Sequence, residues 1–132
     1  MTNIRQIRQF ILSTEEKWNE FPKNNLPWVR HWLDTKRNAP FKFRCRKPVG
    51  FSVPSIAVFL YEGRYVGSAI TNGEVIPISE DPYTGKVSFE PNSIKIFDPC
   101  PQRLEGMKFR RNLVKLTWSQ YQNILRIAGE ET

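Results

Sequence analysis

The 132-residue sequence carries 20 lysine and arginine residues against 13 acidic ones, which gives a formal net charge of +7 with its single histidine neutral. The composition, 39% hydrophobic and 25% charged, predicts one globular domain over residues 1–132 with a single modest core. No apolar stretch approaches the roughly 20 residues of a membrane-spanning helix, so we expect no membrane partner. The two cysteines, Cys45 and Cys100, are far apart and lack CxxC spacing. We therefore expect reduced thiols in a cytoplasmic protein, not a disulfide scaffold or zinc site.

The first 21 residues contain one ambiguous segment and one helix signal. Residues 3–12 fit either an amphipathic helix or a short strand, and both alternatives stay open. Ser13 and Glu16 have the spacing of a capping box, which predicts a helix from residue 14 to about residue 21.

A second short helix is predicted within residues 26–33. Pro27 suits its first turn, and Trp28 and Trp32 are four residues apart and share one side. His31 lies between the tryptophans with no catalytic partner at motif spacing, and we interpret it as a surface or packing residue.

Strand signals begin at residue 41. Residues 41–46 alternate strictly, which predicts a strand with an apolar inner face and a cationic outer face. Residues 56–61 and 65–70 are apolar runs joined by a turn with Gly63, and they predict a hairpin. Asn72-Gly73 is a further turn signal, and shorter strands are predicted at residues 74–78, 86–89, 93–97 and 106–109, the last extending toward residue 116.

A closing helix is predicted after residue 117. Thr117 and Gln120 form a second capping box, and helical spacing gives an inner face of Trp118, Tyr121, Leu125 and Ala128. Short strands followed by edge helices predict an α+β fold, in which a small bent antiparallel sheet or β-barrel has helices packed at its edges.

The strongest local charge asymmetry runs from residue 35 to residue 61, where no acidic residue occurs. A cationic strand face of this kind neutralises backbone phosphates of nucleic acid, and a second basic cluster after residue 106 could extend it. The predicted backbone-binding residues are Lys36, Arg37, Lys42, Arg44, Arg46, Lys47, Lys108 and Arg110.

Aromatic residues flank this basic stretch. Stacking of a nucleic-acid base needs two or three aromatic rings that converge beside the cationic face. Trp28 and Trp32 are the first candidates for such a base pocket because they directly precede the basic strand, and Trp18 and Tyr61 complete the set.

Motifs of other chemistries are missing from the sequence. It contains no Walker loop, no GxSxG and no HExxH, and its acidic residues are scattered. We therefore assign no catalytic residue, no metal and no cofactor.

Four segments resemble the PUA-like superfamily, which includes the PUA, ASCH, EVE and YTH domains. They are residues 8–18, 56–69, 91–97 and 116–121, which match the opening strand and helix, the hairpin, a late strand and the closing helix. Pro54 and Ser55 stand where the superfamily usually has Gly-Asp, and the ASCH signature is missing, so the subfamily stays open.

The resemblance implies a non-enzymatic domain that grips RNA or DNA by a basic surface and takes a base, plain or modified, into an aromatic pocket. Two alternatives from other classes stay open. One is a metal-independent ribonuclease that uses Tyr61, Arg64 and Tyr65 at the hairpin turn, and the other is a protein-interaction module with exposed aromatics. The sequence leaves the oligomeric state open.

Overall fold

The computed structural model describes residues 4–12, 14, 21–43, 53–80, 83–104 and 114–130, without the side chains of residues 43 and 114. Within these residues the fold consists of a seven-stranded sheet, two α-helices and one 3₁₀ turn. The predicted α+β class is confirmed. The predicted helix over residues 14–21 lies almost entirely outside the described residues.

The sheet is mixed and open. Its strand order is β2-β5-β4-β3-β1-β7, and β6 pairs with β4 beside this path. β1 and β3 are parallel, whereas the other described pairs are antiparallel, so the expected purely antiparallel sheet is corrected at this point. Within the described residues no pairing joins β2 to β7, so no closed barrel forms. The strands are β1 (Gln6–Ile11), β2 (Phe41–Phe43), β3 (Ser55–Tyr61), β4 (Arg64–Glu80), β5 (Tyr83–Phe89), β6 (Lys95–Ile96) and β7 (Val114–Leu116).

The predicted hairpin is confirmed as β3 and β4, which are joined by a turn at Glu62 and Gly63, both with positive φ. The ambiguous N-terminal segment is strand β1. The late strand expected over residues 93–97 is shorter, because a 3₁₀ turn (η1, Pro91–Ser93) occupies its start.

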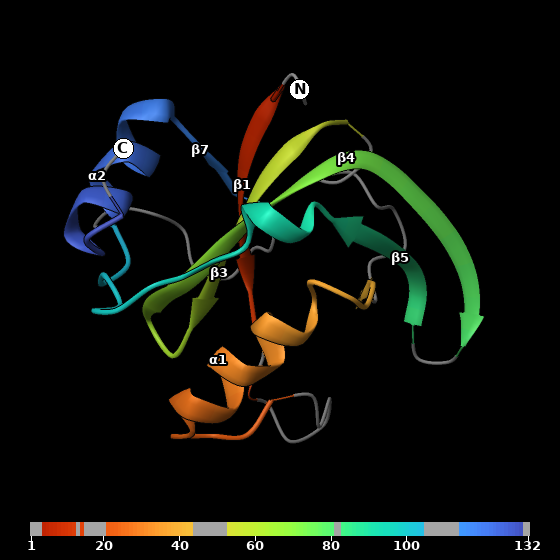
Figure 1. The fold of residues 1–132 in the computed structure, drawn as a ribbon, viewed down its shortest axis with the longest axis horizontal. Helices are drawn as coiled ribbons and strands as arrows, with labels where there is room; N and C mark the ends of the chain where they lie inside the picture. Colours follow the sequence, from red (N-terminus) through yellow and green to blue (C-terminus); the bar gives the residue numbers. More distant parts are fainter. Residues whose placement is uncertain are drawn as a thin grey trace.

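β4 does not turn at Asn72-Gly73, so the prediction of a turn there is wrong. The strand continues to Glu80, and its register with β5 shifts between Thr71 and Val75. Gly73 has φ +90°, and the Val53 backbone would lie 2.5 Å from a Cβ built on it. The glycine therefore permits a β-bulge that bends a single strand. Figure 1 shows β4 and β5 curving away from the central strands as an arm.

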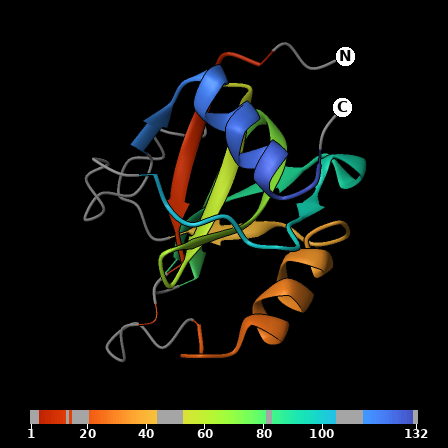
Figure 2. The same cartoon turned by 90° about the vertical axis from the view of Figure 1, so that its left-hand side faces the viewer.

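β3 is buried on both faces and separates two apolar clusters. One face of β3 carries Ala57, Phe59 and Tyr61 into the cluster that packs under α1 (Leu26–Thr35). The other face carries residues 56, 58 and 60 into the cluster that packs under α2 (Trp118–Ile127). The two views in Figures 1 and 2 show the helices well apart, each over its own part of the sheet.

Both helices begin as their sequences predict. The side chain of Asn25 accepts a hydrogen bond from the Trp28 N–H at the start of α1, and Pro27 lies in its first turn. Thr117 and Gln120 make the complete capping box of α2. These contacts fix the direction in which each helix leaves the sheet.

The inner face of α2 differs from the prediction at its first residue. Tyr121, Ile124 and Ala128 are buried, whereas Trp118 is 54% exposed, so its expected place in the core is wrong. Trp118 is the first helical residue, and its ring lies edge-on to Tyr121 at 6.2 Å.

Candidate nucleic-acid interface

One side of α1 carries an aromatic and cationic stripe formed by Trp28, Trp32 and Lys36. These residues are four apart, so they follow one another along the same side of the helix and its C-cap. The Lys36 Nζ lies 5.1 Å from the centroid of the Trp32 ring, within the range of a cation–π interaction. The structure thus joins two predicted base-pocket residues to a predicted phosphate-binding residue.

The two tryptophans differ in exposure. Trp32 is half-buried, and its ring packs against Phe41 at 5.8 Å and Phe59 at 6.0 Å in the α1 cluster. Trp28 is 42% exposed and is supported from one side by Phe21, whose ring lies edge-on at 6.0 Å. Trp32 therefore anchors the helix, while Trp28 offers aromatic surface to solvent.

Charge accumulates where the stripe meets strand β2. Burial, together with the positive charge of Lys42, lowers the pKa of the Lys36 ammonium below its usual value. Lys42 is exposed on β2, and its Nζ lies 2.6 Å from the Glu80 carboxylate at the far end of β4. The hydrogen bond and charge of Lys42, with a smaller contribution from Lys86, lower the pKa of the Glu80 carboxyl.

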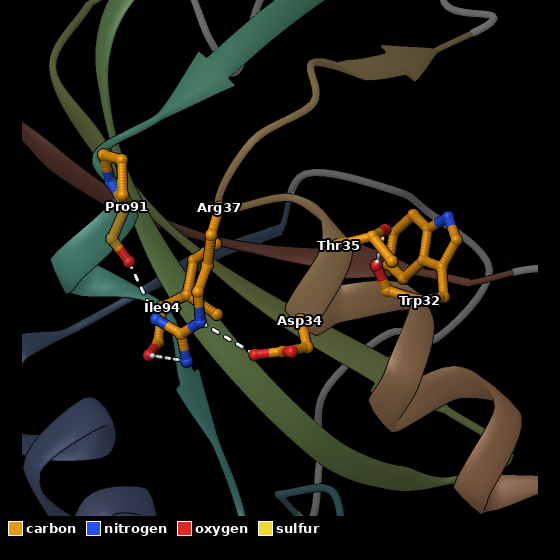
Figure 3. A network of polar contacts seen from close by, with 6 residues as sticks. All are labelled: Trp32, Asp34, Thr35, Arg37, Pro91 and Ile94. Carbon is orange, nitrogen blue, oxygen red and sulfur yellow. Dashed lines mark hydrogen bonds and ion pairs between the residues drawn. The ribbon is translucent and has the colours of Figure 1, made fainter.

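Arg37 has a different environment from its neighbour Lys36. Its guanidinium donates hydrogen bonds to Asp34 Oδ1 at 2.8 Å, to the Pro91 carbonyl at 2.8 Å and to the Ile94 carbonyl at 3.3 Å. Figure 3 shows Arg37 reaching toward Pro91 and Ile94, whereas the Trp32 ring points away from this network. Arg37 therefore ties the end of α1 to the segment around η1.

Tyr61 lies inside the protein. Its ring is 3% exposed, and its hydroxyl donates to the Pro22 carbonyl and accepts from the Asn25 N–H at 3.0 Å. These contacts hold the loop that leads into α1 and so position Trp28. Tyr61 supports the aromatic stripe from beneath and offers no open stacking surface.

Both tyrosines of the ribonuclease alternative are buried, and their hydroxyls already make hydrogen bonds. The Tyr65 ring is fully buried, and its hydroxyl donates to Gln9 Oε1 at 2.7 Å. Burial raises the pKa of Tyr61 and of Tyr65 above their usual values, so neither phenol is set up to act as a base. Arg64 is exposed at the turn, but it has no free tyrosine hydroxyl beside it in the described residues.

The other predicted site residues lie outside the described residues. They are Trp18, Arg44, Arg46, Lys47, Lys108 and Arg110. The first two described residues of the basic strand, Phe41 and Lys42, do alternate as expected, with Phe41 buried and Lys42 exposed.

Lys86 is a cationic residue near this surface that sequence reasoning missed. It pairs directly with Lys42 across β2 and β5. The alternation of residues 86–89 indicates that Lys86 and Val87 point to opposite faces, but it carries no information about which strand lies alongside.

Two kinds of feature are missing from the described part of the chain, a cluster of metal ligands and a membrane-spanning helix. Nowhere in it do three or more histidine, cysteine or acidic side chains come together as ligands for a metal ion. Its helices are also too short and too polar to cross a membrane.

Comparisons with known proteins find likeness in structure alone. No protein-family model matches the sequence, and no curated protein matches it. A solved structure, "YTH domain-containing protein mmi1 and RNA complex", is similar with a TM-score of 0.51 at 11% sequence identity, over 93% of this chain and 82% of that chain. The chain therefore has a fold similar to that of a YTH domain, which supports the predicted PUA-like resemblance at the level of the fold.

Proposed function

We propose that this chain is an RNA-binding domain without enzymatic activity, which holds the RNA backbone by its cationic surface and stacks a base on Trp28. The observation that carries this proposal is the stripe on α1. In it the exposed Trp28, the half-buried Trp32 and the cation Lys36 follow one another toward Lys42. Stacking surfaces that continue into cations are the arrangement by which proteins grip single-stranded nucleic acid.

Two further observations support the proposal. The net charge of +7 favours a polyanionic partner, and the structurally similar YTH domain-containing protein was solved in complex with RNA. In this proposal the predicted cations Arg44, Arg46 and Lys47 continue the phosphate contacts beyond Lys42.

A base on Trp28 would lie at the solvent-facing end of the stripe. Phe21 supports the indole edge-on, and the loop of residues 22–25 is held by the Tyr61 hydroxyl, so the ring is fixed before RNA arrives. Such pre-ordering lowers the entropy cost of binding. A titration of the same RNA carrying a modified base, beside the plain RNA used below, decides whether the base is plain or modified.

The test is a fluorescence-anisotropy titration with labelled single-stranded RNA and with DNA of the same sequence, in EDTA and about 50 mM salt. We expect RNA binding and full recovery of intact RNA. Trp28→Ala should weaken binding about 5- to 150-fold, which corresponds to the 1–3 kcal/mol of one base–aromatic stack.

Trp118→Ala is the matched control, because Trp118 is also an exposed tryptophan in the first turn of a helix, 54% exposed against 42% for Trp28. We expect it to leave the affinity unchanged. Absence of RNA binding by the wild-type protein would refute the proposal, and equal losses in both variants would refute the role of Trp28. RNA cleavage in EDTA would establish the ribonuclease alternative.

A further inference from the structure

Two lysines face each other directly across strands β2 and β5. Lys42 on β2 and Lys86 on β5 are register partners in an antiparallel pair, with Phe41 opposite Val87 one step along. Phe41 and Val87 are buried, so the two lysines share the opposite, outer face. Like charges directly opposite each other destabilise a sheet, and the pair therefore works against folding.

Among the described residues, a single carboxylate partly compensates this pair of lysines. Glu80 binds Lys42 at 2.6 Å, at the end of the strand that runs alongside β5. Lys86 lies close enough for its charge to act on Glu80, yet its own side chain has no hydrogen-bond or ion-pair partner among the described residues. In the described part of this surface, the Glu80 carboxylate thus interacts with the positive charges of both lysines.

The lysine pair interacts electrostatically with the cationic end of the stripe on α1. Lys42 also acts electrostatically on Lys36, which caps the aromatic stripe of α1. The cations therefore continue from the end of the stripe, around the edge strand β2, onto the outer face of the β2–β5 pair.

We propose that Lys42 and Lys86 together bind a phosphodiester group of RNA. In the free protein Glu80 forms an ion pair with Lys42, and the phosphate displaces Glu80 when RNA binds. The inference rests on the proposed function and extends it to Lys86 and Glu80. A phosphate placed between the two ammonium groups accepts hydrogen bonds from both and removes their repulsion, which Glu80 relieves only in part.

The test measures RNA affinity of Lys86→Gln and Glu80→Gln between about 50 and 200 mM salt, beside the wild-type protein. Loss of one phosphate contact in Lys86→Gln should make the slope of the logarithm of the association constant against the logarithm of the salt concentration less steep by about 0.7. At 50 mM salt this change corresponds to roughly eightfold weaker RNA binding. Glu80→Gln should bind about two- to fivefold more tightly, because an exposed ion pair no longer competes.

Three controls separate this effect from general charge loss and from misfolding. Arg126→Gln removes the same charge on α2, far from the arm, and should keep the wild-type slope. Lys86→Gln should unfold at the same or a higher temperature than wild type at low salt, since it removes a repulsion. Lys86→Arg, which keeps the charge, should retain wild-type affinity.

The outcomes distinguish the two proposals. RNA binding by the wild type with equal slopes for Lys86→Gln and Arg126→Gln would overturn the phosphate site and leave the proposed function standing. A Lys86→Arg variant as weak as Lys86→Gln would also overturn it. Failure of the wild type to bind RNA would overturn both proposals.

Discussion

Gly67 shows how a single missing side chain lets the layers of this fold meet. A Cβ at this position would lie 2.3 Å from Leu33 Cδ2 of α1 and 2.4 Å from the Lys95 carbonyl oxygen of β6. β4 can therefore pair with β6 and lie under α1 at the same point only because residue 67 is a glycine.

Gly67→Ala should destabilise the protein, at the upper end of the roughly 1–3 kcal/mol that overpacking costs. Urea unfolding measures the change. The double variant Leu33→Ala with Gly67→Ala should be less stable than Leu33→Ala alone, because truncating Leu33 leaves the Lys95 carbonyl in the way. Full rescue of the glycine substitution by Leu33→Ala would contradict this reasoning.

At the residue scale, the sequence identifies which residues are aromatic or charged, but not which of them solvent reaches. Trp28 and Trp118 both lie in the first turn of a helix, and the sequence predicts only Trp28 outside the core. Tyr61 was expected in a pocket, yet it is buried with its hydroxyl bonded to the loop before α1. Exposure depends on contacts between distant segments, which periodicity does not contain.

At the scale of elements, α1 is fastened by two arginines to carbonyl groups of the segment around η1 and β6. Arg37 bonds the Pro91 and Ile94 carbonyls, and Arg30 bonds the Phe97 carbonyl at 3.0 Å and Asp98 at 3.5 Å. The segment has little regular structure to satisfy these carbonyls, so Arg30 in α1 and Arg37 just after it supply the donors.

Arg37→Gln should lower the free energy of unfolding by about 1–3 kcal/mol, because carbonyl groups lose charged donors. Lys36→Gln is the matched neighbour. Among the described residues, its ammonium contacts the Pro40 carbonyl at 3.5 Å and the Trp32 ring. We expect it to lose RNA affinity with little loss of stability. The reverse pattern, with stability unchanged and RNA affinity lost for Arg37→Gln, would support the original prediction that Arg37 binds the backbone.

The elements that the sequence predicts well are those specified locally. The capping box at Thr117, the proline in the first turn of α1 and the tight turn at Gly63 need only neighbouring residues, and all three are confirmed. The parallel pairing of β1 with β3 and the continuation of β4 through Gly73 depend on segments far along the chain. Lys86 was missed for the same reason.

At the scale of the whole molecule, both apolar clusters contain tyrosines. Tyr61 belongs to the α1 cluster, whereas Tyr65 and Tyr121 belong to the α2 cluster. Burial raises the pKa of all three above the usual value, although a hydrogen bond to each hydroxyl opposes the shift. Folding therefore holds the three phenols in their neutral form.

Alkaline pH should consequently unfold the protein. Above about pH 10 the tyrosines of the unfolded chain lose their protons while those of the folded protein keep them. The free energy of unfolding therefore falls as the pH rises. Their contribution to stability is complete below that pH and is lost as the pH rises through the folded pKa values. Each such tyrosine steepens the decline by up to about 1.4 kcal/mol per pH unit.

Tyr121→Phe tests this by urea unfolding between about pH 8 and pH 11.5, a range that brackets the unperturbed tyrosine pKa. The variant loses the hydrogen bond to Ser68 Oγ at 2.9 Å, but its alkaline decline should be shallower by up to about 1.4 kcal/mol per pH unit. Ser68→Ala removes the same hydrogen bond and keeps the phenol, so its decline should stay at least as steep as in the wild type. Lys36, whose pKa is lowered, acts with the opposite sign and is common to all three proteins. Equal declines in Tyr121→Phe and Ser68→Ala would show that Tyr121 ionises as readily in the folded protein as in the unfolded chain.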